Sequence, residues 1–163
     1  MSNLNVVAKR ESSSYRVSVD IDDFVFTVKF DTGASDTVIS AGVFSDILTE
    51  TDLERFKTYC EEHSGFNKDF ISATGDEFKG YLVTAHNVKM GKMILPEFRY
   101  YLVVENKRDI ALLGYDFIDK CRCSHEPNRH FYLTGFDVDG YGKAVGAMEN
   151  DEVIAFIDSL TED

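Results

Sequence analysis

The stretch Phe26-Thr-Val-Lys-Phe-Asp31-Thr-Gly-Ala-Ser-Asp-Thr-Val-Ile39 decides the fold that we predict for this chain. An apolar strand pattern runs directly into an acidic residue, Asp31, and a second strand pattern resumes a few residues later. Gly33 permits a sharp turn between the two predicted strands. A turn held between two core strands is rigid, which suits a carboxylate that must keep one position. The three letters Asp-Thr-Gly alone are also typical of an ordinary acidic turn.

A second informative stretch, Ala111-Leu-Leu-Gly114-Tyr-Asp-Phe-Ile118, is an apolar strand pattern that ends at a glycine. The first stretch resembles the active-site signature of the aspartic proteases, in which apolar residues precede Asp-Thr-Gly-Ala/Ser and residues like Thr-Val-Ile follow. The second resembles that family's apolar-apolar-Gly strand, which runs beside the catalytic loop and leads into a short helix. Because both occur in the family's order, the chain resembles a retropepsin-like (retroviral-type) aspartic protease.

This resemblance implies a fold and an activity. The implied fold is mainly β, a single-lobe acid-protease (retropepsin-like) closed β-barrel with one or two short helices. The implied activity is that of an aspartic endopeptidase, which hydrolyses peptide bonds with an activated water and uses no metal or other cofactor. The resemblance covers about residues 15–135 and is specific in its motifs only at 30–39 and 111–118. The catalytic residues that it predicts are Asp31, Thr32 and Gly33.

The stretch Phe70-Ile-Ser-Ala-Thr-Gly-Asp-Glu-Phe-Lys-Gly80-Tyr-Leu-Val resembles the family's flap, a hairpin that folds over the substrate. An ordinary surface hairpin has the same pattern of two strands around a turn. An extended polypeptide substrate would bind between the flap and the active-site turn through backbone hydrogen bonds, as in strand addition. The predicted substrate-binding residues are Gly33, Ala34, Asp36, Thr74, Gly75 and Asp76.

The number of Asp-Thr-Gly signatures predicts a homodimer. Aspartic proteolysis uses two carboxylates that share one proton, because like charges about 3 Å apart cannot both ionise. This chain contains a single Asp-Thr-Gly, so the second carboxylate must be Asp31 of another copy. A twofold symmetric dimer brings two identical residues together in one self-complementary contact. The resemblance implies the same arrangement.

Two positions depart from the retroviral pattern, which usually has an Asp after Asp-Thr-Gly-Ala and an Arg after the downstream glycine. Ser35 and Tyr115 stand there instead, so both members of an ion pair are absent together. We expect the Ser35 hydroxyl to bond Tyr115 or the backbone. A helical segment within residues 45–65 and a tail after about residue 124 also exceed a minimal retroviral enzyme. These departures indicate a non-viral, cellular branch.

The remaining patterns divide the chain into parts. Residues 1–14 predict a flexible N-terminal arm, residues 15–135 the protease-like domain, and residues 136–163 a C-terminal extension with an amphipathic helix. Alternation over residues 15–30 predicts a hairpin whose turn is Asp22-Asp23. Two helix starts are also predicted, by the capping-box pattern Thr51-x-x-Glu54 and by Asn150.

Composition restricts the partners and the location that we expect. The chain has 163 residues, with 29 acidic and 17 basic side chains and a formal charge of −12. Such a charge repels phosphate, so we expect no nucleic-acid partner and no anionic-membrane partner. The sequence shows no secretory signal pattern, and its three cysteines are an odd number that favours a reducing compartment. We therefore expect a cytoplasmic protein.

Two weaker patterns have plainer explanations than metal binding. The set Cys121, Cys123, His125 and His130 contains zinc-ligand residue types, but its irregular spacing favours thiols in a polar loop. The stretch Asp137-Val-Asp-Gly140 matches the start of a calcium loop yet lacks the later ligands, which favours a β-turn. We therefore predict no metal site.

One functional alternative keeps the fold without the chemistry. A non-catalytic retropepsin-fold module for peptide binding or assembly would hold an extended peptide or a partner chain and leave it intact. The presence of the complete Asp31, Thr32 and Gly33 signature favours the enzyme.

Overall fold

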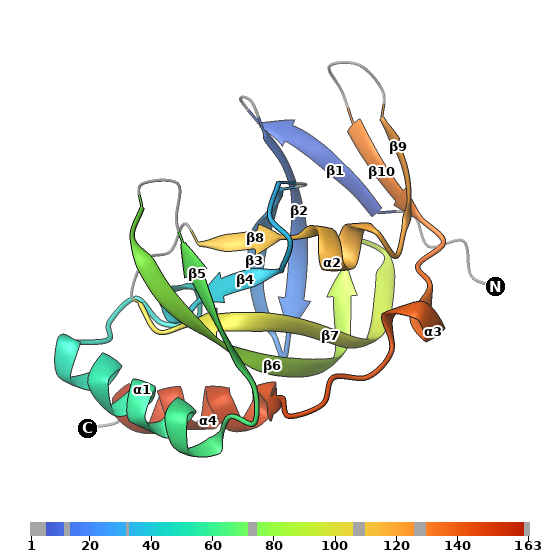
Figure 1. Ribbon diagram of the computed structural model, residues 1–163. Helices are drawn as coiled ribbons and strands as arrows, with labels where there is room; N and C mark the ends of the chain where they lie inside the picture. The colour runs from blue at the N-terminus through green and yellow to red at the C-terminus, as the bar shows by residue number, and fades with distance from the viewer. Residues whose placement is uncertain are drawn as a thin grey trace. The chain divides into compact units, whose positions relative to one another are not determined.

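The computed structural model describes residues 6–11, 14–31, 33–71, 75–105, 110–125 and 130–161 (Figure 1). These residues form two compact units, and each unit is made of several separate segments of the chain. Unit 1 comprises the residues up to Thr37, then His86–Phe98 and Ala111–Lys143. Unit 2 comprises Val38–Ala85, Arg99–Ile110 and the residues from Ala144 onward.

Unit 1 begins with the hairpin that the sequence predicts. Strand β2 (Ser14–Ile21) pairs antiparallel with β3 (Phe24–Phe30), with Ile21 opposite Phe24. The turn residues Asp22 and Asp23 have φ angles of 50° and 70°. Left-handed backbone at both central positions is the geometry that suits the twist of a two-residue hairpin. The predicted hairpin and its turn are therefore confirmed.

The N-terminal segment differs from the prediction. Val6–Glu11 forms strand β1, which pairs with β2 on one side and with β10 (His130–Thr134) on the other. Strand β10 also pairs with β9 (Arg122–His125), so β1, β10 and β9 lie side by side (Figure 1). The prediction of a flexible arm is wrong for these residues, because strand β10, from a distant part of the sequence, completes the backbone hydrogen bonds of β1.

Two further elements complete unit 1 beside the hairpin. Strand β8 (Ala111–Leu113) pairs parallel with the end of β3 and leads into the single-turn helix α2 (Tyr115–Ile118). Another single turn, α3 (Val138–Tyr141), is capped by the Asp137 carboxylate, which accepts a hydrogen bond from Gly140 N at 2.9 Å. The β-turn predicted there is thus a short helix, because Asp137 provides an N-cap.

Strands β6 (Glu77–Met90) and β7 (Met93–Val103) run through both units. Within unit 1, Val19 of β2 stands opposite Met90 of β6, and both side chains are fully buried. The core of unit 1 consists of apolar residues from these strands and from α2. Its fully buried members include Val19, Ile21, Val28, Val88, Met90, Met93, Leu95, Phe98, Leu113 and Phe117.

Unit 2 contains the two longer helices of the described residues. Helix α1 (Glu50–His63) and helix α4 (Asn150–Thr161) lie side by side (Figure 1). The Phe156 ring stacks on Tyr59 at 4.1 Å between centroids and also contacts Phe56. Because α4 buries Val153 and Ile157 and stacks Phe156 on α1, the predicted amphipathic helix packs against its own chain.

The start of α1 corrects a second prediction. Thr49 is the N-cap: its hydroxyl accepts from Asp52 N, and the Asp52 carboxylate accepts from Thr49 N. The capping box predicted at Thr51-x-x-Glu54 is wrong, because both residues already lie inside the helix. An N-cap residue needs extended backbone, and Thr49 has it, with φ −80° and ψ 168°.

The rest of unit 2 is built on β6 and β7. Strand β4 (Val38–Ser40) pairs parallel with β7, and the 3-10 turn η1 (Ala41–Val43) follows it. Strand β5 (Asn67–Ile71) pairs antiparallel with β6, and β11 (Met148–Glu149) pairs parallel with β6. No helix among the described residues is long and apolar enough to cross a membrane.

Candidate active site

The Asp31 turn lies in unit 1, directly after β3. Asp31 N donates to Leu113 O at 3.0 Å, which fixes the backbone where the strand ends. Gly33 N donates to the Asp31 carboxylate at 3.1 Å, and Ala34 N donates to Asp31 O at 3.1 Å. Asp31 is half-buried and Gly33 is exposed. Both the backbone and the side chain of Asp31 are therefore held by hydrogen bonds at a partly open position.

The two informative stretches of the sequence meet at this turn. Strands β3 and β8 are parallel, with Phe30 opposite Leu113. Beyond the strands the contact continues, since Tyr115 N donates to Ala34 O at 2.8 Å and Asp116 N donates to Ser35 O at 3.1 Å. The predicted apolar-apolar-Gly strand thus runs beside the Asp31 turn, and a short helix follows it.

Gly114 makes this close approach possible. A β-carbon on Gly114 would stand 2.3 Å from both the carbonyl carbon and the carbonyl oxygen of Asp36. Real β-carbons do not come so near to backbone atoms, so any other residue would push α2 away from the turn. The glycine is therefore required by packing rather than by an unusual φ angle.

A carboxylate that the sequence analysis did not predict, Asp116, binds the end of the Asp31 turn. Asp116 Oδ1 accepts from the Thr37 hydroxyl at 2.8 Å and from Phe117 N at 2.8 Å, and Oδ2 accepts from Thr37 N at 3.2 Å. Burial raises the pKa of Asp116 above its ordinary value of 3.8; the hydrogen bonds from Thr37 oppose this rise, and the nearby charge of Asp36 adds to it. The only sequence signal was an acid inside an apolar run, directly after Gly114-Tyr115.

The remaining predicted residues of the turn lie beside Asp31. Ala34 and Asp36 are half-buried in the same turn, whereas Thr32 lies outside the described residues. The Ser35 hydroxyl donates to the Asp36 carboxylate at 2.8 Å. The expected bond from Ser35 to Tyr115 or the backbone is therefore wrong, because the adjacent carboxylate is the stronger acceptor.

The predicted flap is a hairpin of unit 2. Strands β5 and β6 pair antiparallel, with Ile71 opposite Glu77 next to the turn. Gly75 has a φ of 88°, and Gly75 and Asp76 are exposed; Thr74 lies outside the described residues. The hairpin is confirmed. Its role as a flap stays a prediction.

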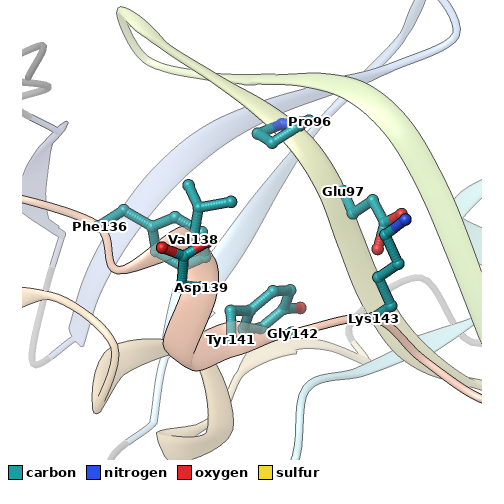
Figure 2. A pocket seen from close by; sticks show the side chains of 8 residues that line it. All are labelled: Pro96, Glu97, Phe136, Val138, Asp139, Tyr141, Gly142 and Lys143. Carbon is teal, nitrogen blue, oxygen red and sulfur yellow. The ribbon is translucent and has the colours of Figure 1, made fainter.

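A separate pocket of about 220 Å³ lies in unit 1, lined by residues of β7 and of the segment around α3 (Figure 2). Phe136, Val138 and Tyr141 provide apolar walls, and Glu97 and Lys143 stand at its edge. The pocket contains none of the predicted site residues, and its volume is below the range of about 300–1,000 Å³ that is typical of small-molecule sites. Among the described residues, no group of three or more His, Cys, Asp or Glu side chains could hold a metal ion.

Comparison with known proteins adds to this geometry. The structure matches the crystal structure of a retropepsin-like aspartic protease from Rickettsia conorii, with a TM-score of 0.54 and 17% sequence identity. The match covers 82% of this chain and 92% of that chain. The chain has a retropepsin-like fold. At this identity the likeness shows the fold alone, and it confirms the predicted class, a mainly β retropepsin-like lobe.

Comparison of the whole sequence does not find this fold. No protein-family model matches the chain, and no curated protein matches it significantly in sequence. The signature around Asp31 and the stretch around Gly114 are therefore the sequence features that connect the chain to this fold.

Proposed function

We propose that the chain is one protomer of a homodimeric aspartic endopeptidase in which Asp31 supplies the catalytic carboxylate. The observation that carries this proposal is the position of Asp31 at the end of β3, with its carboxylate bonded to Gly33 N and its backbone bonded to Leu113. This is a carboxylate in fixed geometry, partly open to solvent, in a retropepsin-like fold. Fixed geometry is what a general acid or base requires.

The proposed chemistry needs Asp31 from two chains. In the pair, the ionised carboxylate takes a proton from a bound water, and the protonated one donates a hydrogen bond to the scissile carbonyl. The water attacks, and no covalent acyl-enzyme forms. Because the single proton belongs to the pair, we expect the highest activity in mild acid, where the pair holds one proton.

The proposed substrate is a polypeptide in extended conformation. The Gly33 carbonyl, next to Asp31, is a candidate for a strand-like hydrogen bond to the substrate backbone. Ala34 and the side chain of Asp36 are further candidate contacts in the same turn. In the β5–β6 hairpin, Gly75 and Asp76 are exposed and are the described candidates for flap contacts. The proposed location is cytoplasmic, which the odd number of cysteines supports, since three cysteines make a poor disulfide framework.

The first experiment compares peptide cleavage by wild type, Asp31→Asn and Asp23→Asn. Both substitutions remove one negative charge, but Asp23 lies in the exposed β2–β3 turn. We expect Asp31→Asn to lose at least about a thousandfold in kcat and Asp23→Asn to keep wild-type activity. Full cleavage by Asp31→Asn would contradict the proposed mechanism.

A mixing experiment tests the dimer separately. Wild type and Asp31→Asn are unfolded together, refolded at constant total concentration and assayed at several ratios. If both carboxylates are needed, activity follows the square of the wild-type fraction, because only wild-type pairs are active. A linear dependence would show that one chain acts alone. Binding of a pepstatin-type transition-state mimic without any cleavage would instead favour the non-catalytic module.

A further inference from the structure

The Asp116 carboxylate is a partly buried acid to which the chemistry above assigns no role. It joins two segments that are 79 residues apart in the sequence, through two hydrogen bonds from Thr37. Thr37 is fully buried, and Asp116 is half-buried on α2. The contact lies in unit 1, at the end of the turn that begins with Asp31.

The direction of each hydrogen bond in this cluster is fixed. Gly114 N donates to the Thr37 hydroxyl oxygen at 3.1 Å, and the hydroxyl uses its one proton to donate to Asp116 at 2.8 Å. The other partners of the carboxylate, Thr37 N and Phe117 N, are also donors. Three donors facing one group require an acceptor at every contact, and an ionised carboxylate is acceptor-only.

The cluster holds the far end of the Asp31 turn. Near the start of the turn, Asp31 N donates a hydrogen bond to Leu113 O. In its middle, Tyr115 N donates a hydrogen bond to Ala34 O, and Asp116 N donates one to Ser35 O. At its end, the Asp116 side chain binds both the backbone and the side chain of Thr37. The turn is thus attached to residues 113–116 at Asp31, at Ala34 and Ser35, and at Thr37.

A partly buried carboxylate is an unfavourable choice if stability is the only requirement. Among the described residues its hydrogen-bond partners are two N–H groups and one O–H group, and none is a cation. Burying a charge without a counterion costs free energy that neutral side chains avoid. Such locally unfavourable choices concentrate at functional sites.

We propose that Asp116, acting through Thr37, is a positioning residue that holds the Asp31 turn in the geometry needed for two carboxylates to share one proton. This inference rests on the proposed endopeptidase function. The proposal predicts that Asp116 makes the Asp31 turn locally more ordered, and this order can be measured without any substrate.

The central variant is Asp116→Asn, which has nearly the same shape. Its amide offers one acceptor oxygen and one donor group, so one of its atoms must face a donor of Thr37 or Phe117. The matched control is Asp119→Asn, which removes the same charge from an exposed residue at the end of α2. Thr37→Val removes the hydroxyl link and leaves the carboxylate, and Thr37→Ser is the conservative variant that keeps the hydroxyl.

The first readout is amide hydrogen exchange by NMR. We expect Asp116→Asn and Thr37→Val to accelerate exchange at Gly33, Ala34 and Tyr115 by at least about tenfold, the usual effect of losing one net hydrogen bond. Amides of the β2–β3 hairpin should exchange at wild-type rates. Asp119→Asn should match wild type, and Thr37→Ser should stay within about threefold of it.

The second readout is the division between kcat and KM. We expect Asp116→Asn to lower kcat at least about tenfold with KM within about threefold, because the turn orders the reacting groups more than it binds substrate. If wild type shows no cleavage that depends on Asp31, the proposed function fails, while the exchange experiment still decides whether Asp116 orders the turn.

Three outcomes would overturn the proposal. Exchange at Gly33 and Ala34 within twofold of wild type in Asp116→Asn would show that the carboxylate does not order the turn. Equal acceleration in the β2–β3 hairpin would show a general loss of stability. Failure of both Asp116→Asn and Thr37→Val to fold, while Thr37→Ser folds, would assign the cluster to folding instead of positioning.

Discussion

Gly114 and Asp36 are in direct backbone contact, and the space between them is too small for a methyl group. A β-carbon on Gly114 would also come within 2.8 Å of Thr37 N. The atoms that it would meet belong to the backbone, so no side chain can move aside to make room. The contact joins the strand before α2 to the turn after β3, and both carry the sequence features that identify the fold.

Gly114→Ala is therefore expected to destabilise the protein by about 3 kcal/mol, the upper part of the range for overpacking, and to abolish the proposed peptidase activity. Urea unfolding measures the loss of stability. The comparison variant is Gly135→Ala, where φ is +60° but the nearest atom to a β-carbon is Arg122 Cδ at 3.9 Å. That variant should cost only about 1 kcal/mol, from backbone strain. Equal losses in the two variants would contradict the steric explanation.

The cap of α1 gives a second prediction with an internal control. Thr49→Ala removes the hydroxyl that accepts from Asp52 N and should lower the free energy of unfolding by about 1 kcal/mol. Thr51→Ala alters a residue already inside the first turn and should change it by less than about 0.5 kcal/mol. If Thr51→Ala lowered the free energy of unfolding more than Thr49→Ala did, the assignment of Thr49 as the N-cap would be wrong.

The β2–β3 turn offers a stabilising change. Asp23 has a φ of 70°, which an L side chain adopts at a cost and which glycine adopts freely. Asp23→Gly should raise the free energy of unfolding by about 0.5–1 kcal/mol. Lys92→Gly, in the β6–β7 turn, gains no such relief because Lys92 lacks a positive φ. Thermal unfolding of both variants checks the sign, and a gain for Lys92→Gly alone would contradict this reasoning.

The partly buried carboxyl group of Asp116 predicts a pH dependence of stability. Burial raises its pKa in the native state above the ordinary value of 3.8, so the native protein binds this proton more readily than the unfolded chain does. Stability therefore falls as pH rises through the window from about 3.8 up to the raised pKa. Urea unfolding at several pH values should show wild type losing stability relative to Asp116→Asn across this window. A difference that is independent of pH would contradict the raised pKa.

The sequence patterns predicted those elements whose structure depends mainly on neighbouring residues. The β2–β3 hairpin followed from alternation around Asp22-Asp23, and the Asp31 turn followed from an acid between two strand patterns. The start of α1 was misplaced by two residues, from Thr49 to Thr51, because two overlapping patterns with a Thr and an acid three residues later fit the same segment. Backbone angles, which the sequence does not show, select Thr49.

Long-range contacts account for the other differences. Strand β1 was missed because its partner β10 comes from near the other end of the chain. Asp116 was missed because its hydrogen bonds come from Thr37, a residue far away in the sequence, and neither residue type by itself predicts the contact. Asp31 and the β5–β6 hairpin were found by resemblance to a family, whereas their catalytic and flap roles remain predictions.

The division of the chain into two units has a consequence for attempts to separate the units as fragments. The polypeptide passes back and forth between the units, at positions 37–38, 85–86, 98–99, 110–111 and 143–144. No single cut, by a protease or by a cloning primer, can release either unit as one continuous fragment. To produce one unit by itself, an experimenter would have to join segments that are far apart in the sequence.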